Sequence, residues 1–186
     1  MEFTDWHTHD PDAPATALIS VEPRDFKPRD GRFYSVGVHP WSTADDDLER
    51  QLLLLDSMLR HPRVVALGEV GLDRLRGATI ESQLQILERQ LAIAANVRQM
   101  PVVIHCVRAY DEIITVHRRW SDRLHDRWII HGFRRGPKLA RRLIDEGFYI
   151  SFGTRYNHLA FEITPPSRRL RETDFTPLYT NENLSL

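Results

Sequence analysis

Histidine and carboxylate residues stand at the ends of short apolar runs throughout this chain. They are His7, His9, Glu69, His105, His131 and Asp174. Side chains alternate between the two faces of a strand, so His7 and His9 project to the same side. Strands that each end in a metal-type ligand predict a metal centre assembled at one rim of a parallel β/α barrel. This pattern indicates an enzyme site.

Eight apolar runs qualify as strands of that barrel. They are residues 1–9, 17–21, 33–39, 64–69, 101–106, 127–132, 148–153 and 168–174. Helical patterns separate the later runs, and alternating strands and helices favour a mostly parallel sheet. The four buried stripes are Leu48, Leu52, Leu55 and Leu59; then Leu84, Leu87, Leu91 and Ala95; then Ile113, Val116 and Trp120; and last Leu139 and Leu143. We expect Ser42 and Thr43 to cap the first of these helices, and Gly136 and Gly147 to bound the last.

The first third of the chain lacks room for the usual helices. Between His9 and Phe33 one strand and two loops fit, but two crossover helices do not. The chain has 186 residues, where an eight-fold barrel typically has about 250, and it ends shortly after Asp174. We therefore expect an α/β fold, a TIM-type (β/α)8 metal-dependent hydrolase barrel with some outer helices missing. It should form one domain over residues 1–186, with loops or a homodimer covering the apolar strand surface left bare.

Charge and composition limit the kinds of molecule that this chain is expected to bind. The formal net charge of −1 disfavours an electrostatic grip on long duplex nucleic acid, but it leaves single-stranded or small phosphate-containing substrates open. No apolar run approaches the roughly 20 residues that span a bilayer, so no membrane partner is expected. The acidic N-terminus is unlike a signal peptide, and the single cysteine, Cys106, excludes an internal disulfide. These features predict a cytoplasmic protein.

Six motifs in order along the chain resemble one known family. They are Asp5-x-His7-Thr8-His9, Gly37-Val38-His39-Pro40, Gly68-Glu69-Val70-Gly71-Leu72-Asp73, Pro101-Val102-Val103-Ile104-His105, His131-Gly132-Phe133 and Glu172-Thr173-Asp174. In this order they resemble the TatD-type metal-dependent hydrolases, a DNase-related family within the amidohydrolase-like superfamily. The set spans nearly the whole chain, and it is specific as a set although no single motif decides.

The resemblance implies a set of metal ligands. His7 and His9 bind one metal with Asp174, His105 and His131 bind the second, and Glu69 bridges both. Imidazole and carboxylate suit zinc, manganese or iron, and carboxylate with water suits magnesium, so two divalent ions (Mg, Mn or Zn) are expected. The implied reaction is hydrolysis by water activated between the metals, with Asp174 as general base and Glu69 as the shared ligand.

Other residues near these motifs have less certain roles. Asp73 is expected to orient a ligand or to contact the substrate, and Arg108 and Arg134 are candidates for substrate phosphates at the barrel mouth. The simpler interpretation of Arg134 and its neighbour Arg135 is that they are solvated charges near a helix start, since only their position supports phosphate binding. His39 is either a hydrogen-bonded structural residue or a substrate contact. The remaining side chains are expected to be inert: Cys106 as a small buried residue, and His61, His117, His125 and His158 at the surface.

The substrate follows from the resemblance more than from the residues. Metal-dependent hydrolysis is what the ligand set itself indicates, and the family resemblance adds a phosphodiesterase or deoxyribonuclease working from the end of single-stranded DNA or RNA. An amide, an ester or a lactone is an alternative substrate, because a fold does not select its chemistry. A degenerate, non-catalytic relative is the third possibility.

Overall fold

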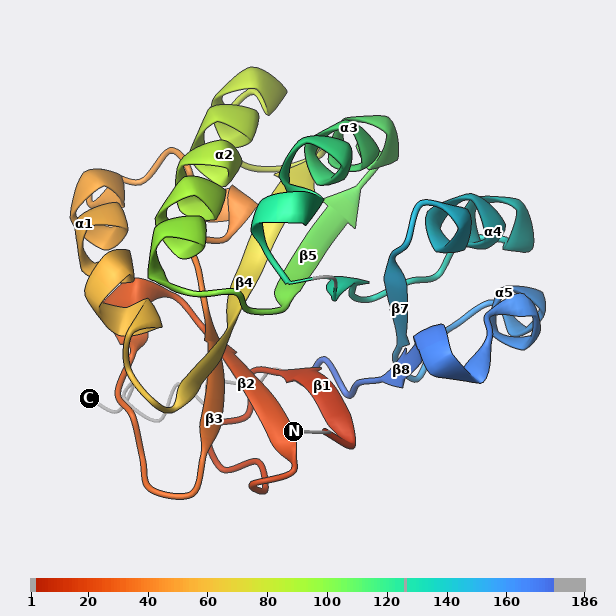
Figure 1. Ribbon diagram of the computed structural model, residues 1–186, viewed down its shortest axis with the longest axis horizontal. Helices are drawn as coiled ribbons and strands as arrows, with labels where there is room; N and C mark the ends of the chain where they lie inside the picture. Colours follow the sequence, from red (N-terminus) through yellow and green to blue (C-terminus); the bar gives the residue numbers. More distant parts are fainter. Residues whose placement is uncertain (1–2, 126, 176–186) are drawn as a thin grey trace, which may run out of the picture.

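Eight parallel strands form the centre of the computed structural model, which describes residues 3–125 and 127–175 (Figure 1). The strands are β1 (Asp5–Thr8), β2 (Ala17–Val21), β3 (Phe33–Val36), β4 (Val64–Asp73), β5 (Val102–Val107), β6 (Trp128–Ile130), β7 (Tyr149–Phe152) and β8 (Arg169–Arg171). Each strand pairs in parallel with the next one along the chain, in the order β1 to β8. The predicted parallel β/α architecture is confirmed.

The segment after β8 closes the barrel against β1. The backbone N–H of Asp174 donates to the carbonyl of His7 at 3.0 Å, and that of His9 donates to the carbonyl of Phe175 at 2.9 Å. The hydroxyl of Thr173 also donates to the Asp5 carboxylate at 2.6 Å. Because these bonds continue the ladder between the two ends of the sheet, Asp174 is brought beside the first metal motif.

The expected helices are present, and a short one is added. They are α1 (Leu48–Leu59), α2 (Ile80–Val97), α3 (Tyr110–Trp120), α4 (Pro137–Asp145) and α5 (His158–Ile163). The stripes predicted four of these, whereas α5 has only six residues, too few to show a helical repeat. Within the described residues, only a short 3₁₀ turn, η1 (Pro23–Asp25), lies in the two connections between β1 and β3. The outer helices expected to be missing there are therefore absent.

Helix α1 begins later than predicted. Asp47, not Ser42 or Thr43, is its N-cap residue. Pro40 starts a 3₁₀ turn, η2 (Pro40–Ser42), and the Thr43 hydroxyl donates back to the Pro40 carbonyl at 2.7 Å. The Ser-Thr pair is used in that local turn, so the prediction of the cap was wrong.

Two apolar layers hold the barrel. Leu55, Leu59, Leu87 and Leu91 on α1 and α2 are buried with the outward-facing strand residues in the larger layer. Burial of each such side chain stabilises the fold by about 1.5–3 kcal/mol. A smaller inner cluster includes Leu18, Ala66, Val103 and Ile129. Val103 and Ile129 precede His105 and His131 by two residues, so they share the inward face and form the floor beneath the site.

Loops cover the strands that lack helices. Ile19 on β2 is buried in a cluster with Ala13 and Tyr34, and Phe26 packs edge-on against Tyr34 at 5.4 Å. The connections on either side of β2 thus cover the gap, one of the two remedies expected from the sequence. The homodimer stays a prediction.

Candidate metal centre

A single buried carboxylate lies at the centre of the histidine cluster. The Oε1 atom of Glu69 is 2.7 Å from both His131 Nε2 and His105 Nδ1. Its Oε2 atom is 3.3 Å from His7 Nε2 and 3.6 Å from His9 Nε2. The two oxygens thus face different pairs of imidazoles, which is the arrangement a bridging ligand requires.

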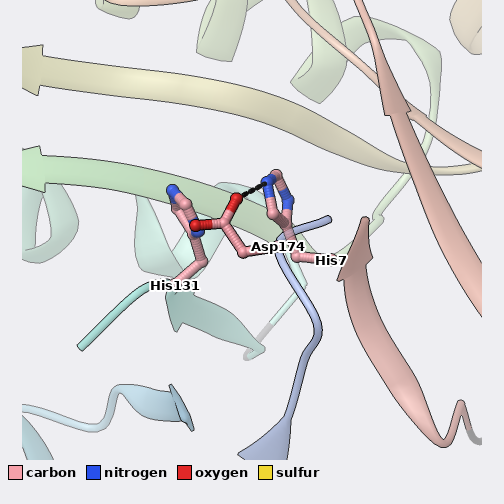
Figure 2. A group of neighbouring side chains, drawn as sticks. All are labelled: His7, His131 and Asp174. Atoms are coloured by element: carbon pink, nitrogen blue, oxygen red, sulfur yellow. Dashed lines mark ion pairs between the residues drawn. The ribbon is translucent and has the colours of Figure 1, made fainter. Parts of the chain in front are cut away.

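Asp174 completes the side of the cluster formed by β1. Figure 2 shows its carboxylate between the rings of His7 and His131, with Oδ1 3.8 Å from His7 Nε2. The backbone of Asp174 has φ 49°, a left-handed conformation that is unfavourable for a residue other than glycine. Its N–H bond to His7 stabilises this conformation, so the barrel closure itself positions the side chain.

Glycines allow β4 to approach β5 closely enough to form the cluster. Gly71 pairs with His105, and a Cβ atom at Gly71 would overlap the His105 carbonyl oxygen. A Cβ atom at Gly68, directly before Glu69, would likewise come within 2.7 Å of Val103. These contacts explain why glycines stand on both sides of Glu69 within β4.

His39 joins the cluster, a role that the sequence left undecided. Its Nε2 atom is 3.1 Å from Glu69 Oε1 and 3.3 Å from His105 Nδ1. Among the residues that the structure describes, His39, Glu69 and His105 form one of three groups whose atoms are close enough to hold a metal ion. The other two groups are His7, His9 and Glu69, and His7, His131 and Asp174.

Asp73 contacts the Nε2 side of the His105 ring, the side that faces away from Glu69. Its Oδ2 atom is 3.1 Å from His105 Nε2 and accepts a 2.7 Å bond from the Trp41 indole N–H, while Oδ1 accepts from the Leu75 backbone at 2.8 Å. Burial would raise the pKa of Asp73, but these bonds lower it. An ionised Asp73 can accept a proton held on His105 Nε2, and in that tautomer the Nδ1 lone pair on the Glu69 side is available to a metal ion. Its contacts favour the orienting role over substrate contact.

Replacing Asp73 by asparagine should weaken the site without emptying it. One side-chain N–H₂ group would face donors where the carboxylate accepts, and His105 would lose its fixed tautomer. We expect a loss of about 10- to 100-fold in metal affinity or in kcat/KM. Competition with a fluorescent chelator and steady-state kinetics measure the two quantities, and wild-type values for both would contradict the orienting role.

Glu172 supports His131 in a similar way, and sequence reasoning gave it no role. Its Oε1 atom accepts a 2.6 Å bond from the Gly132 N–H and lies 3.6 Å from His131 Nδ1. Glu172 precedes Asp174 by two residues, so both project inward from the end of the sheet. This two-residue spacing from Asp174 was the sequence signal that could have identified Glu172 as part of the site.

The ionisable groups of the cluster shift one another's pKa values. Burial would raise the pKa of Glu69, but His131 and His7 hold it well below its usual value. Burial lowers the pKa of His7, whereas Glu69 and Glu172 outweigh burial at His131 and raise its pKa. Glu69 is therefore ionised, and of its two histidine neighbours His131 takes up a proton more readily than His7.

The distances between histidine ring nitrogens show whether these side chains lie close enough together to share a metal ion. His7 Nε2 lies 3.2 Å from His9 Nε2, and His131 Nε2 lies 3.5 Å from His105 Nδ1. Imidazole nitrogens that lie this close to one another and to a buried carboxylate match the donor preference of divalent ions, which bind the neutral form of the ring. The residues present therefore fit divalent metals.

A comparison of the sequence with known families adds an independent observation. The family described as TatD related DNase matches residues 27–183 of this chain. The chain belongs to the TatD-related DNase family. Its ordered motifs had indicated the same relationship.

Curated relatives of this TatD-related chain match part of their own length. The 3'-5' ssDNA/RNA exonuclease TatD of Citrobacter koseri is 34% identical over 117 residues, covering 62% of this chain and 44% of that protein. The enzyme of the same name from Klebsiella pneumoniae is 30% identical over 159 residues, covering 77% and 57%. The uncharacterized metal-dependent hydrolase YabD of Bacillus subtilis is 30% identical, covering 74% and 51%. The chain thus spans about half the length of these relatives.

Solved structures from the family share the fold. YJJV, a TatD homolog from Escherichia coli K12, superposes with a TM-score of 0.77 at 24% identity, covering 92% of this chain and 78% of that one. A TatD family hydrolase from Entamoeba histolytica gives a TM-score of 0.69 at 17% identity, covering 94% and 74%. These similarities confirm the barrel.

A cavity of about 860 Å³ opens above the cluster of this TatD-related chain. Its lining includes His9, His39, Glu69, His105, His131 and Asp174. Arg76, which the sequence did not single out, also lines it. Arg108, Arg134 and Arg135 are exposed and lie outside the described lining, so their contact with substrate remains a prediction.

Of the other histidines, His117 was wrongly expected at the surface. It is buried, with its ring 4.3 Å from that of Phe148 and 5.1 Å from that of Trp128. Three residues before Trp120 on α3, it faces the barrel, because one polar side chain on an apolar helical face packs with its neighbours.

Cys106 is buried, as expected, and should be chemically inert. Burial raises the pKa of its thiol to about 12 from the model-compound value of 9.0. At pH 8 that shift lowers the thiolate population about 1,000-fold, and only the thiolate reacts with disulfide reagents. We expect slow labelling by a colourimetric thiol reagent in the native protein and one rapid equivalent after denaturation. Rapid native labelling would show that the thiol is accessible.

Proposed function

We propose that this chain is a divalent-metal-dependent phosphodiesterase that removes nucleotides from an end of single-stranded DNA or RNA. The observation that carries the proposal is the buried Glu69 carboxylate, whose two oxygens face different sets of imidazoles. Family membership supports the metal-dependent hydrolase class, and relatives named as exonucleases support the substrate.

Two metal ions, magnesium, manganese or zinc, are proposed within this cluster. His7, His9 and Asp174 would hold one ion and His105 and His131 the other, with Glu69 shared between them. When bound, the two ions supply Lewis acidity to the scissile phosphate and lower the pKa of water. The proximity of His39 to Glu69 makes it a further candidate ligand on the His105 side.

The protein's own groups would orient the reactants and move the proton. Asp174 has a side chain about one-third exposed (32%) and lies at the cavity, so it can accept the proton that the attacking water releases. The proton acceptor would be the oxygen of the Asp174 carboxylate that does not face His7. Asp73 and Glu172 hold His105 and His131 in position, and the apolar floor of the barrel limits access of bulk water from below.

The decisive experiment is cleavage of an end-labelled single-stranded oligonucleotide with added magnesium or manganese. A His131→Ala protein purified in parallel controls for a contaminating nuclease, and EDTA should stop the reaction. Cleavage by the wild type alone would support the proposal. No cleavage by metal-loaded protein would reject it in favour of an ester, lactone or amide substrate, which a panel of such compounds would reveal. Failure of the purified protein to bind metal would favour a degenerate relative.

Three further expectations remain proposals. The chain acts as a single domain over residues 1–186, in the cytoplasm, and forms a homodimer. Among the described residues, no helix is long and apolar enough to cross a membrane. Size-exclusion chromatography with light scattering tests the dimer.

A further inference from the structure

Trp41 and Arg76 form a stacked pair at the mouth of the cavity. The guanidinium carbon of Arg76 lies 3.9 Å from the centroid of the Trp41 ring. Both residues line the cavity that also contains Glu69 and Asp174, and Trp41 is 40% exposed. An exposed tryptophan beside a reaction centre offers a large flat surface to a ligand.

The indole of Trp41 is held firmly against the metal cluster. Its N–H donates to Asp73 at 2.7 Å. The ring packs edge to face with His39 at 4.6 Å and with His105 at 5.6 Å between centroids. Trp41 is therefore a rigid surface at a fixed place beside the cluster.

The backbone of Arg76 is fixed by a buried glutamine. The side-chain amide N–H₂ of Gln83, only 1% exposed, donates to the carbonyls of Asp73, Arg76 and Ala78 at 2.8–2.9 Å. Gly77 lies so close to Pro40 that a Cβ atom would overlap the Pro40 carbonyl oxygen. The loop that carries Arg76 is thus tied both to α2 and to the turn that carries Trp41.

The guanidinium of Arg76 retains its hydrogen-bonding capacity. Neighbouring arginines are paired: Arg74 with Glu112, and Arg24 with Glu22, Asp45 and Asp47. Across the described residues, no carboxylate lies within ion-pair distance of Arg76. It is also the only arginine or lysine in the described lining, which includes the carboxylates of Glu22, Asp25 and Asp45. A polyanion entering the cavity is therefore drawn to the side of Arg76.

We infer that Trp41 and Arg76 bind the terminal nucleotide of the strand, with its base stacked on the guanidinium–indole pair and its phosphate directed toward the metal cluster. This inference rests on the proposed function and specifies its substrate contact. Stacking of a base on an aromatic or guanidinium plane is tolerant of sequence and contributes about fivefold to a hundredfold in affinity. The pair therefore favours nucleotides over simple phosphate esters, without selecting a particular base.

Calorimetry with two small ligands tests this inference without catalysis. Thymidine monophosphate and 2-deoxyribose 5-phosphate differ only in the base, and each is titrated into the metal-loaded protein. We expect the wild type to bind the nucleotide about tenfold more tightly than the sugar phosphate. Arg76→Gln should lose most of this difference. Arg76→Lys should still bind the phosphate, but with a smaller contribution from the base. Arg74→Gln, two residues away and paired outside the cavity, should match the wild type. Equal affinity of the wild type for both ligands, or equal effects of the two glutamine variants, would overturn the inference.

Cleavage assays separate this inference from the proposed function. An oligonucleotide that ends in an abasic residue is compared with an ordinary one, and we expect a higher KM for the abasic end in the wild type but not in Arg76→Gln. Cleavage without any dependence on the terminal base would overturn the inference alone. If the wild type cleaves neither oligonucleotide, the proposed function fails. The calorimetric comparison still decides whether the stacked pair binds a base.

Discussion

Replacing Glu69 by alanine is expected to abolish hydrolysis and to lower metal occupancy at both proposed sites. The carboxylate of Glu69 contacts both sides of the cluster, with Oε2 facing His7 and His9 and Oε1 facing His105, His131 and His39. Loss of an outer partner of a metal ligand typically costs about 10- to 100-fold, and removal of the shared ligand should cost more. Elemental analysis of the purified protein and turnover of the labelled oligonucleotide measure the two effects.

The matched control is Glu49→Ala. Glu49 lies on the surface of α1, where it pairs with Arg89 at 2.6 Å, far in the fold from the barrel interior. This control should retain wild-type metal content and turnover, and circular dichroism should show that both variants are folded. Substantial turnover in Glu69→Ala would defeat the two-metal interpretation.

Replacing Asp174 by asparagine is expected to lower kcat by about 10²- to 10⁴-fold, the usual contribution of a positioned general base. The amide has nearly the same shape and keeps an oxygen that can act as a ligand, but it cannot accept a proton from water. Metal occupancy should therefore fall less than in Glu69→Ala, and KM should change less than kcat. Steady-state kinetics and elemental analysis on the same preparation separate the two effects.

Asp46→Asn serves as the control for this substitution. Asp46 is exposed and lies in the loop before α1, outside the described cavity lining. Its replacement should leave kcat unchanged. A wild-type kcat in Asp174→Asn as well would remove Asp174 from the proton transfer and leave it as a ligand alone.

Local pattern was sufficient to predict the barrel and most of the central cluster. His7, His9, Glu69, His105 and His131 each follow a short apolar run, so a parallel sheet brings them to one side of the barrel, although β4 continues four residues beyond Glu69 and β5 two residues beyond His105. The apolar stripes likewise predicted α1 to α4, because a helix needs one apolar face to pack. Helix α5 was not predicted, because six residues are too few to show that repeat. The cap of α1 was misplaced because Thr43 hydrogen-bonds to the preceding turn.

The amino-acid sequence by itself determined the parallel architecture and the residues available as ligands, because both depend on alternation along single strands. Only the tertiary structure decided how those residues meet. It brought His39 to Glu69, placed Asp73 and Glu172 behind two of the imidazoles, stacked Arg76 on Trp41 and buried His117. Each of these contacts joins segments on different elements, so its distance is set by how the sheet curves and closes. That curvature is a property of the whole packed barrel and has no counterpart in any local run of residues.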